Sequence, residues 1–238
     1  MGHKRRQPLA VAVVQPHCPT GNVAQSTRTH AQLVRDARSR LVIFPELSLT
    51  GYQIDAEPIA VDDPRLRPIV EACVDNSALA LAGAPVLGDD GRRFIAVLGI
   101  DADGVRVAYK KMFLSAEESR SFAAGERAAS VDLDGWRIGL GICKDTGVAV
   151  QVRETTALGI DVYAAGTVIS PEEADEQDER ACRIATSHRV YVAFASWAGP
   201  TGGGYERTAG RSGIWAPDGR PLTRLGPEPG LVARATIL

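Results

Sequence analysis

The amino-acid sequence predicts an α/β fold with mixed sheets. Apolar runs of strand length alternate with helical patterns along the chain. Two pairs of strand-like segments flank Asp-Gly turns, one at 101–104 and one at Asp134-Gly135, as in tight hairpins. No linker, repeat or low-complexity segment interrupts this order. Residues 1–238 are therefore expected to form a single α/β domain behind a frayed leader of residues 1–7.

In the first third of the chain, buried strands alternate with helices. Asn22 is a suitable N-cap for the first helix, and Asp63-Pro64 resembles a cap followed by proline at the first helical position. Ala24, Ala31, Val34 and Ala37 are expected on the inner face of the first helix. The expected strands are 9–15, 41–44 and 78–86, and the expected helices are 22–39 and 63–76.

Hairpins dominate the middle of the chain, and a helix and two strands follow. Alternation along 105–110 would place Val105, Val107 and Tyr109 on one face, with Lys111 on that same face. Ser170, Pro171 and Glu173 together form the signature of a helix start with a capping box. The expected strands here are 93–100, 105–110, 129–133, 136–143, 190–196 and 212–217.

The composition is that of a soluble globular protein. Of the 238 residues 45% are hydrophobic and 24% charged, and the formal net charge is −2. This balance gives no electrostatic case for nucleic acid or an anionic membrane as the main partner. No segment has the length of a membrane span or the pattern of a signal peptide. The four cysteines form no CxxC pair, which favours a reducing cytoplasm over a disulfide framework or a zinc site.

A cysteine with charged neighbours ends one apolar run, in the stretch "GLGICKDTG" at 139–147. Positive charge beside a thiol lowers its pKa, so Cys143 followed by Lys144 could be a nucleophile. A buried structural cysteine is the alternative, and by itself the stretch does not decide. A histidine base is not favoured, because His30 and His188 fall within helices, where solvated histidines are far commoner.

Two other strand ends carry charge. Glu46 follows the run "LVIFP", where partial burial would raise its pKa toward that of a general base. Lys111 ends the hairpin strand, and Glu117 and Glu118 lie shortly after it. Taken alone, each of these residues is more typical of a solvated surface position. The order Glu46, Lys111, Cys143 changes that reading.

With these three segments in order, the sequence resembles the nitrilase, or carbon–nitrogen hydrolase, superfamily. "FPELSLTGY" is similar to the family's glutamate motif, "YKKMFL" to its lysine motif and "GLGICKD" to its cysteine motif. "LAVAVVQ" and "GRSGIWAPDG" match its first strand and a late segment, so the resemblance covers most of the chain. It implies a four-layer αββα sandwich that pairs as a homodimer or higher homo-oligomer.

The resemblance also implies roles for individual residues. Cys143 would be the nucleophile, Glu46 the general base and Lys111 the cation that stabilises the tetrahedral intermediate. "EESRSFAAG" offers Glu118 as the family's second glutamate, with Phe122 and Gly125 as markers. No metal or organic cofactor is needed for this chemistry.

Departures from the family pattern lie around the expected pocket. Phe113 stands where histidine is usual, and Lys144 stands where an aromatic residue is usual. Tyr52, Phe113 and Lys144 are the expected substrate-binding residues. Lys144 either recognises an acidic substrate, such as the ω-amide of a dicarboxylic acid, or points away and pairs with Asp145 or another acid.

The expected activity is cytoplasmic hydrolysis of a small linear amide to carboxylate and ammonia through a thioester. An N-carbamoyl amine or amino-acid hydrolase uses the same residues and is the nearest alternative. A nitrilase, an acyltransferase and a non-catalytic family member stay open.

Overall fold

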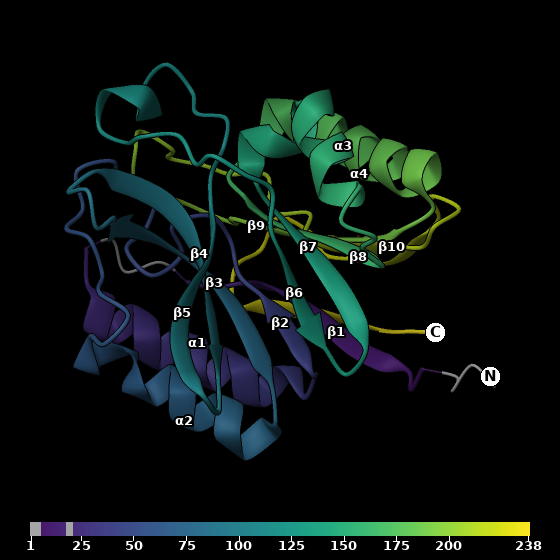
Figure 1. Ribbon diagram of the computed structural model, residues 1–238, viewed down its shortest axis with the longest axis horizontal. Coiled ribbons are helices and arrows are strands. Elements are labelled where there is room, and N and C mark those ends of the chain that lie inside the picture. Colours follow the sequence, from purple (N-terminus) through teal and green to yellow (C-terminus); the bar gives the residue numbers. More distant parts are fainter. Residues whose placement is uncertain (1–5, 18–20) are drawn as a thin grey trace.

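The computed structural model describes residues 6–17 and 21–238, which form four layers in the order helices, sheet, sheet, helices. Figure 1 shows α1 and α2 against the outer face of one sheet and α3 and α4 against the outer face of the other. The predicted αββα sandwich is confirmed. The α-helices are α1 Val23–Ala37, α2 Arg67–Asn76, α3 Ala149–Thr156 and α4 Ala174–His188.

The first sheet has the strand order β12-β1-β2-β3-β4-β5. Its strands β1, β2 and β3 are parallel, and β12, β4 and β5 each pair antiparallel with their neighbours. Consequently β1, β2, β3 and β5 run in one direction. The strands are β1 Leu9–Gln15, β2 Leu41–Ile43, β3 Leu79–Leu87, β4 Arg93–Asp101, β5 Gly104–Lys110 and β12 Leu231–Ile237.

The second sheet repeats this plan in the order β11-β10-β9-β8-β7-β6. Its strands β7, β8 and β9 are parallel and are flanked by antiparallel β6 and β10, with β11 beyond. The strands are β6 Ser130–Leu133, β7 Trp136–Ile142, β8 Val162–Thr167, β9 Tyr191–Ser196, β10 Gly213–Trp215 and β11 Pro221–Arg224.

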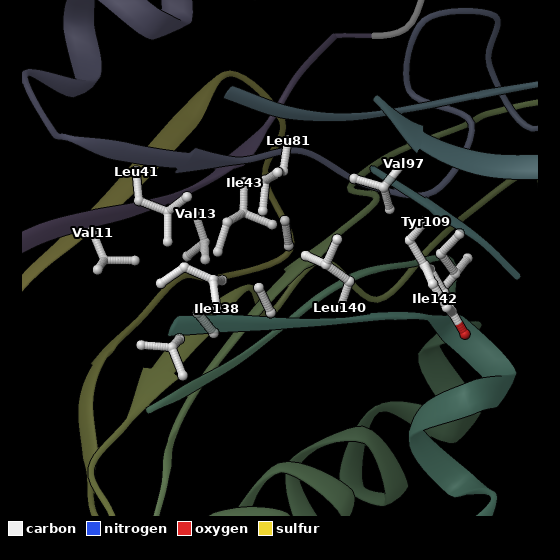
Figure 2. Packing of buried hydrophobic residues seen from close by; sticks show 14 of the residues in the cluster. Val11, Val13, Leu41, Ile43, Leu81, Val97, Tyr109, Ile138, Leu140 and Ile142 are labelled. Atoms are coloured by element: carbon white, nitrogen blue, oxygen red, sulfur yellow. The ribbon is translucent and has the colours of Figure 1, made fainter. Parts of the chain in front are cut away.

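Three apolar clusters fill the spaces between the layers. The central cluster lies between the sheets, and Figure 2 shows side chains such as Val13 and Ile43 of the first sheet facing Ile138 and Leu140 of the second. A second cluster joins the first sheet to α1 and α2, and a third joins the second sheet to α3 and α4. Both faces of each sheet are therefore buried, which explains why the central strands read as continuous apolar runs.

The helix starts follow the local signals in the sequence. The Asn22 side chain accepts a hydrogen bond from Gln25 N and caps α1. A short 3₁₀ turn, Pro64–Leu66, capped by Asp63, leads into α2. Ser170 and Glu173 form the predicted capping box ahead of α4. In α1, Ala31, Val34 and Ala37 are buried as expected, whereas Ala24 is only half-buried.

The expected single face along 105–111 is wrong. Val97 pairs with Tyr109 and Leu98 with Val107, so Ala108 is an extra residue on β5. Such a bulge breaks the two-residue alternation of side chains. Val105 packs on the helix side of the sheet, Val107 is exposed, and Tyr109 lies between the sheets. The bulge therefore turns the end of β5, and Lys111 after it, toward the central space.

The described part of the leader contacts the second sheet. Arg6 pairs with Asp161 and lies over the Trp136 ring, and Trp136 Nε1 donates to Gln7 O over 3.0 Å. The rest of the expected leader, 1–5, lies outside the described residues, as does Cys18. Among the helices that are described, none combines the length and apolar character needed to cross a bilayer.

Candidate active site

The expected catalytic side chains follow strands that end at the same edge of the sandwich. Glu46 follows β2, Lys111 directly follows β5, and β2 and β5 point in the same direction. Cys143 directly follows β7, the neighbour of β8 in the second sheet. Ligands of open α/β sheets bind outside the carboxyl ends of such strands. The fold thereby directs three distant segments to one region.

The segment that carries Glu46 crosses between the two sheets in close contact with backbone on both sides. A Cβ on Gly83 of β3 would lie 2.3 Å from Leu47 N, and one on Gly166 of β8 would lie 2.7 Å from Glu46 N. Only glycine tolerates that approach. Trp197 Nε1 donates to Glu46 O over 2.8 Å, and Leu47 has a φ of 49°. The Glu46 backbone is therefore clamped from both sheets.

A buried lysine joins two carboxylates. Lys111 Nζ donates to Glu46 Oε1 and to Glu118 Oε1, each over 2.6 Å, and all three residues are 1% exposed. Gly125 N donates to Lys111 O over 2.7 Å, and a Cβ on Gly125 would lie 2.2 Å from Lys110 O. The glycine that follows Glu118 in sequence thus packs directly on the lysine segment.

The two carboxylates have different surroundings, which separate their pKa values. Burial acts to raise the pKa of Glu118, but the Lys111 charge and hydrogen bonds from Lys111, Ser115 N and Tyr52 outweigh it, so the pKa is lowered. Burial raises the pKa of Glu46 to about 8 despite the opposing Lys111 charge, and the Glu118 charge raises it further. Among the described residues, Glu46 Oε2 has no hydrogen-bond partner.

This separation indicates distinct tasks, because paired titratable groups with divergent pKa values are typical of acid–base sites. The lowered pKa of Glu118 favours a carboxylate that stays ionised beside the lysine. Glu46 combines a raised pKa of about 8 with a carboxylate oxygen that no described residue binds, which suits a general base. Burial alone would lower the pKa of Lys111, but the charges of Glu46 and Glu118 and the hydrogen bond to Glu118 outweigh it and raise the pKa above its ordinary value. Lys111 consequently stays cationic.

Cys143 occupies a strained turn at the end of β7. Its φ of 42° lies in the left-handed region, which costs a non-glycine residue about 1–3 kcal/mol and is concentrated at functional sites. Its Sγ lies 3.3 Å from Val168 O, just beyond β8. Burial and the Glu46 charge raise the pKa of the thiol to about 12, whereas Lys111 lowers it. These surroundings therefore favour the neutral thiol at Cys143.

A buried polar network, which the sequence analysis did not identify, holds this turn. Asp145 Oδ1 accepts from Phe113 N over 2.9 Å, and its Oδ2 accepts from Ile142 N over 3.0 Å and from the Tyr109 hydroxyl over 2.8 Å. Tyr109 in turn accepts from Gln151 Nε2 over 3.1 Å. Asp145 thereby ties the lysine segment to the cysteine turn. Its position two residues after Cys143 was the available signal; Gln151 in α3 had none.

The three residues expected to bind substrate differ in how they contact the other residues of the site. The Tyr52 hydroxyl donates to Glu118 Oε1 over 2.7 Å, so Tyr52 belongs to the site. The Phe113 backbone binds Asp145, and its side chain is half-buried. The exposed Lys144 donates from Nζ to Leu114 O over 2.6 Å, so its partner is a backbone carbonyl and neither Asp145 nor another acid.

His30 supports the Glu46 segment. Its Nδ1 lies 2.7 Å from Ser26 O, and because a carbonyl only accepts, Nδ1 carries the proton. Its Nε2 then accepts from the Ser48 hydroxyl over 2.9 Å, and Ser48 Oγ also accepts from Gly83 N. Burial lowers the pKa of His30 to about 4, so the ring stays neutral. His30 therefore has both ring nitrogens engaged away from Cys143, and His188 is exposed at the end of α4.

Metal ligation has no candidate cluster here. Within 6–17 and 21–238, no group of three or more His, Cys, Asp or Glu side chains is arranged to hold a metal ion.

Comparison with characterised sequences gives distant relatives over most of the chain. A protein described as "Hydrolase in pqqF 5'region" from Pseudomonas protegens is 29% identical over 236 residues, covering 94% of this chain and 81% of the relative. An (R)-stereoselective amidase from a Pseudomonas species is 27% identical over 126 residues, covering 51% of this chain and 46% of the relative.

Solved structures share the fold. A carbon–nitrogen hydrolase superfamily protein from Xanthomonas campestris superposes with a TM-score of 0.87 at 20% identity, covering 98% of this chain and 91% of that one. An amidase from Nesterenkonia superposes with a TM-score of 0.86 at 22% identity, again covering 98% and 91%. The sequence model of the carbon–nitrogen hydrolase family matches residues 10–237. The chain therefore belongs to the carbon–nitrogen hydrolase family and is a hydrolase of carbon–nitrogen bonds.

Proposed function

We propose that the protein is an amidase that hydrolyses a small linear amide to carboxylate and ammonia through a thioester on Cys143. The observation that carries this proposal is the difference in pKa between the two buried carboxyl groups that contact Lys111. One is fixed and ionised, and the other has a raised pKa of about 8 and a free oxygen. A neutral thiol in a strained turn requires such a base.

In the first half-reaction Glu46 accepts the thiol proton, and the sulfur attacks the amide carbonyl carbon. The carbonyl oxygen becomes an oxyanion, which the Lys111 ammonium stabilises. At about 4 Å and an effective dielectric near 20, this attraction is about 4 kcal/mol. Protonated Glu46 then gives its proton to the amide nitrogen, the carbon–nitrogen bond breaks, and ammonia leaves a thioester.

In the second half-reaction water replaces ammonia. Glu46 accepts a proton from water as the water oxygen attacks the thioester carbonyl, and Lys111 stabilises the second oxyanion. Collapse breaks the carbon–sulfur bond, and the proton on Glu46 returns to the departing sulfur. One water is consumed, and one carboxylic acid and one ammonia are released. Glu118 keeps Lys111 charged and in place through both halves.

Relatives support an amide as the substrate. The Pseudomonas relative that matches about half of this chain is an (R)-stereoselective amidase. A formamidase from Bradyrhizobium is 27% identical over 123 residues, which is 46% of this chain and 36% of that protein.

The test is a panel of amides, N-carbamoyl amines and nitriles, scored by ammonia release with wild type, Cys143→Ala and Cys182→Ala. Cys182 is exposed on α4, so Cys182→Ala is the matched control that should retain turnover. We expect ammonia from amides, none with Cys143→Ala, and an acyl adduct on Cys143 by mass spectrometry of the quenched reaction.

Other outcomes separate the alternatives. Release from carbamoyl compounds alone would indicate an N-carbamoyl hydrolase, and release from nitriles a nitrilase. Formation of hydroxamate at the expense of acid, with hydroxylamine present, would indicate acyl transfer. Ammonia release that persists in Cys143→Ala would refute the thioester. Homo-oligomerisation and a cytoplasmic location stay predictions, and light scattering of the purified protein tests the first.

A further inference from the structure

The catalytic groups lie beneath a loop that the mechanism above does not use. Glu46, Lys111 and Glu118 are almost fully buried, and so is Tyr52, whose hydroxyl binds Glu118. The segment 199–208, which connects β9 to β10, packs directly on Tyr52. Through Tyr52, the loop is therefore one side chain away from the Glu118 carboxylate.

The loop is closed at its base, and further along it Thr201 Oγ1 accepts a hydrogen bond from Tyr52 N over 3.1 Å. Ala198 and Ala209 form an antiparallel bridge, and Thr208 Oγ1 donates to Gly199 O over 2.7 Å, which closes the base. At the tip the ring of Tyr205 meets the ring of Tyr52 edge-on, with centroids 5.4 Å apart. An edge-to-face pair and a single hydrogen bond are each weak enough to break and re-form repeatedly.

Glycines allow the tip to lie flat on Tyr52. A Cβ on Gly202 would lie 2.5 Å from Tyr52 O, and one on Gly203, which has a φ of 63°, would lie 2.6 Å from Tyr52 Cδ1. Gly203 and Gly204 are exposed on their other side. Three successive glycines give this segment the backbone freedom of a hinge. The loop is thus closely fitted to Tyr52, and the hydrogen bond from Tyr52 N to Thr201 Oγ1 adds to these contacts.

The wall beside the cysteine is apolar and consists of one isoleucine and two alanines. Cys143 packs against a cluster of Ile169, Ala174 and Ala209, and Ala209 directly follows the loop. An acyl group attached to Cys143 would contact methyl groups here. The nearest cation in sequence, Lys144, is bonded to Leu114 O instead.

We propose that residues 199–208 form a lid over the active site and that Tyr205 is a specificity-determining residue, which limits the substrate to short, uncharged aliphatic acyl groups. The choice of substrate rests on the proposed amidase activity, whereas the lid does not. The half-buried Tyr205 packs on Tyr52, whose hydroxyl binds Glu118; burial raises the pKa of the Tyr205 hydroxyl to about 12, and the charges of Glu173, Glu46 and Glu118 contribute.

The first test measures access to Cys143 without turnover. Two thiol reagents are used, the small iodoacetamide and the bulky N-phenylmaleimide. They are applied to wild type and to the variants Tyr205→Ala, Tyr205→Phe and Thr208→Val. Labelling of Cys143 is measured by peptide mass spectrometry relative to the exposed Cys182 of the same molecule. Tyr191→Ala is the matched control, because Tyr191 is a half-buried tyrosine that packs on Trp136 at the amino end of β9.

We expect Tyr205→Ala to raise the ratio of bulky to small labelling at least about tenfold, the discrimination that one or two missing carbon contacts can remove. Thr208→Val, which loosens the base and leaves the ring in place, should speed both reagents. Tyr205→Phe and Tyr191→Ala should match wild type. The lid would be overturned if Cys143 labelling relative to Cys182 stayed at the wild-type level with both reagents in Tyr205→Ala and Thr208→Val. An equal increase in Tyr191→Ala would also overturn it.

The second test measures kcat/KM for acetamide, butyramide, hexanamide and succinamic acid. Wild type should favour the short neutral amides, and Tyr205→Ala should raise the hexanamide-to-acetamide ratio at least about tenfold. Preference of wild type for succinamic acid, or an unchanged ratio in Tyr205→Ala, would overturn the specificity role. If wild type turns over no amide, the proposed function fails, and the labelling ratios still decide whether the lid exists.

Discussion

Replacement of Gly83 by alanine tests whether catalysis depends on the close contact between β3 and the segment that carries Glu46. The added Cβ would lie 2.3 Å from Leu47 N and 2.6 Å from Pro45 O, both of them backbone atoms. Ordinary contacts of carbon begin at about 3.5 Å, so the segment must retreat by about 1 Å. A displacement of that size costs about a hundredfold in rate when it misplaces a catalytic group.

The fold should tolerate this change. Overpacking of this kind costs about 1–3 kcal/mol, which is below the unfolding free energy of about 5–15 kcal/mol that is typical of a globular protein. Gly99→Ala is the matched control, because Gly99 lies in the adjacent strand β4 and its added Cβ would lie no closer than 3.5 Å to another atom.

The assay is kcat/KM for ammonia release from the best amide in the panel, together with the thermal midpoint of each variant. We expect Gly83→Ala to lose about a hundredfold in kcat/KM while it remains folded, and Gly99→Ala to retain wild-type turnover. Equal turnover in the two variants would refute the dependence of catalysis on the clamped Glu46 segment.

Three other perturbations address charge and protonation. Lys111→Met should lower kcat/KM by at least about a hundredfold, because it removes the cation that faces the oxyanion; near-normal ammonia release would contradict this role. Glu118→Gln should move the acid limb of the pH–kcat/KM profile below its wild-type position near pH 8, because loss of the Glu118 charge favours ionised Glu46; an upward shift would exclude the assignment. Burial lowers the pKa of His30 from 6.5 in the unfolded chain to about 4 in the folded protein. The free energy of unfolding should therefore fall by up to roughly 3 kcal/mol as the pH decreases through that window. In His30→Gln, denaturant titrations at neutral and mildly acidic pH should show a smaller loss, and an equal loss would point to another group.

Several helix starts and hairpin turns were predictable because backbone preference and hydrophobic period are local properties. The Asn22 cap, the Ser170–Glu173 capping box and the Asp-Gly hairpins each depend on residues within a few positions of one another. Strand β8, "VYAAGT", and helix α3, "AVQVRETT", were not predicted. Small residues and a weak apolar stripe give them little local signal, and packing against neighbouring strands stabilises them instead.

The bulge at Ala108 shows where alternation fails. The extra residue reverses the faces of β5, so Val105 and Tyr109 lie on opposite sides of the sheet. Nothing in "VRVAYK" marks the position, because the bulge is set by pairing with β4. Lys111 consequently reaches the space between the sheets through a tertiary feature.

The sequence was enough to predict which side chains would act as nucleophile, base and cation, because these are chemical identities of residues that follow recognisable strands. Only the tertiary structure decided how each of them behaves. Glu46 and Lys111 are 65 positions apart, and the depth of burial and the neighbouring charges that set a pKa come from residues on other strands. Long-range packing of the two sheets therefore sets the pKa difference between Glu46 and Glu118. It also places the polar network behind Cys143 and the loop over Tyr52.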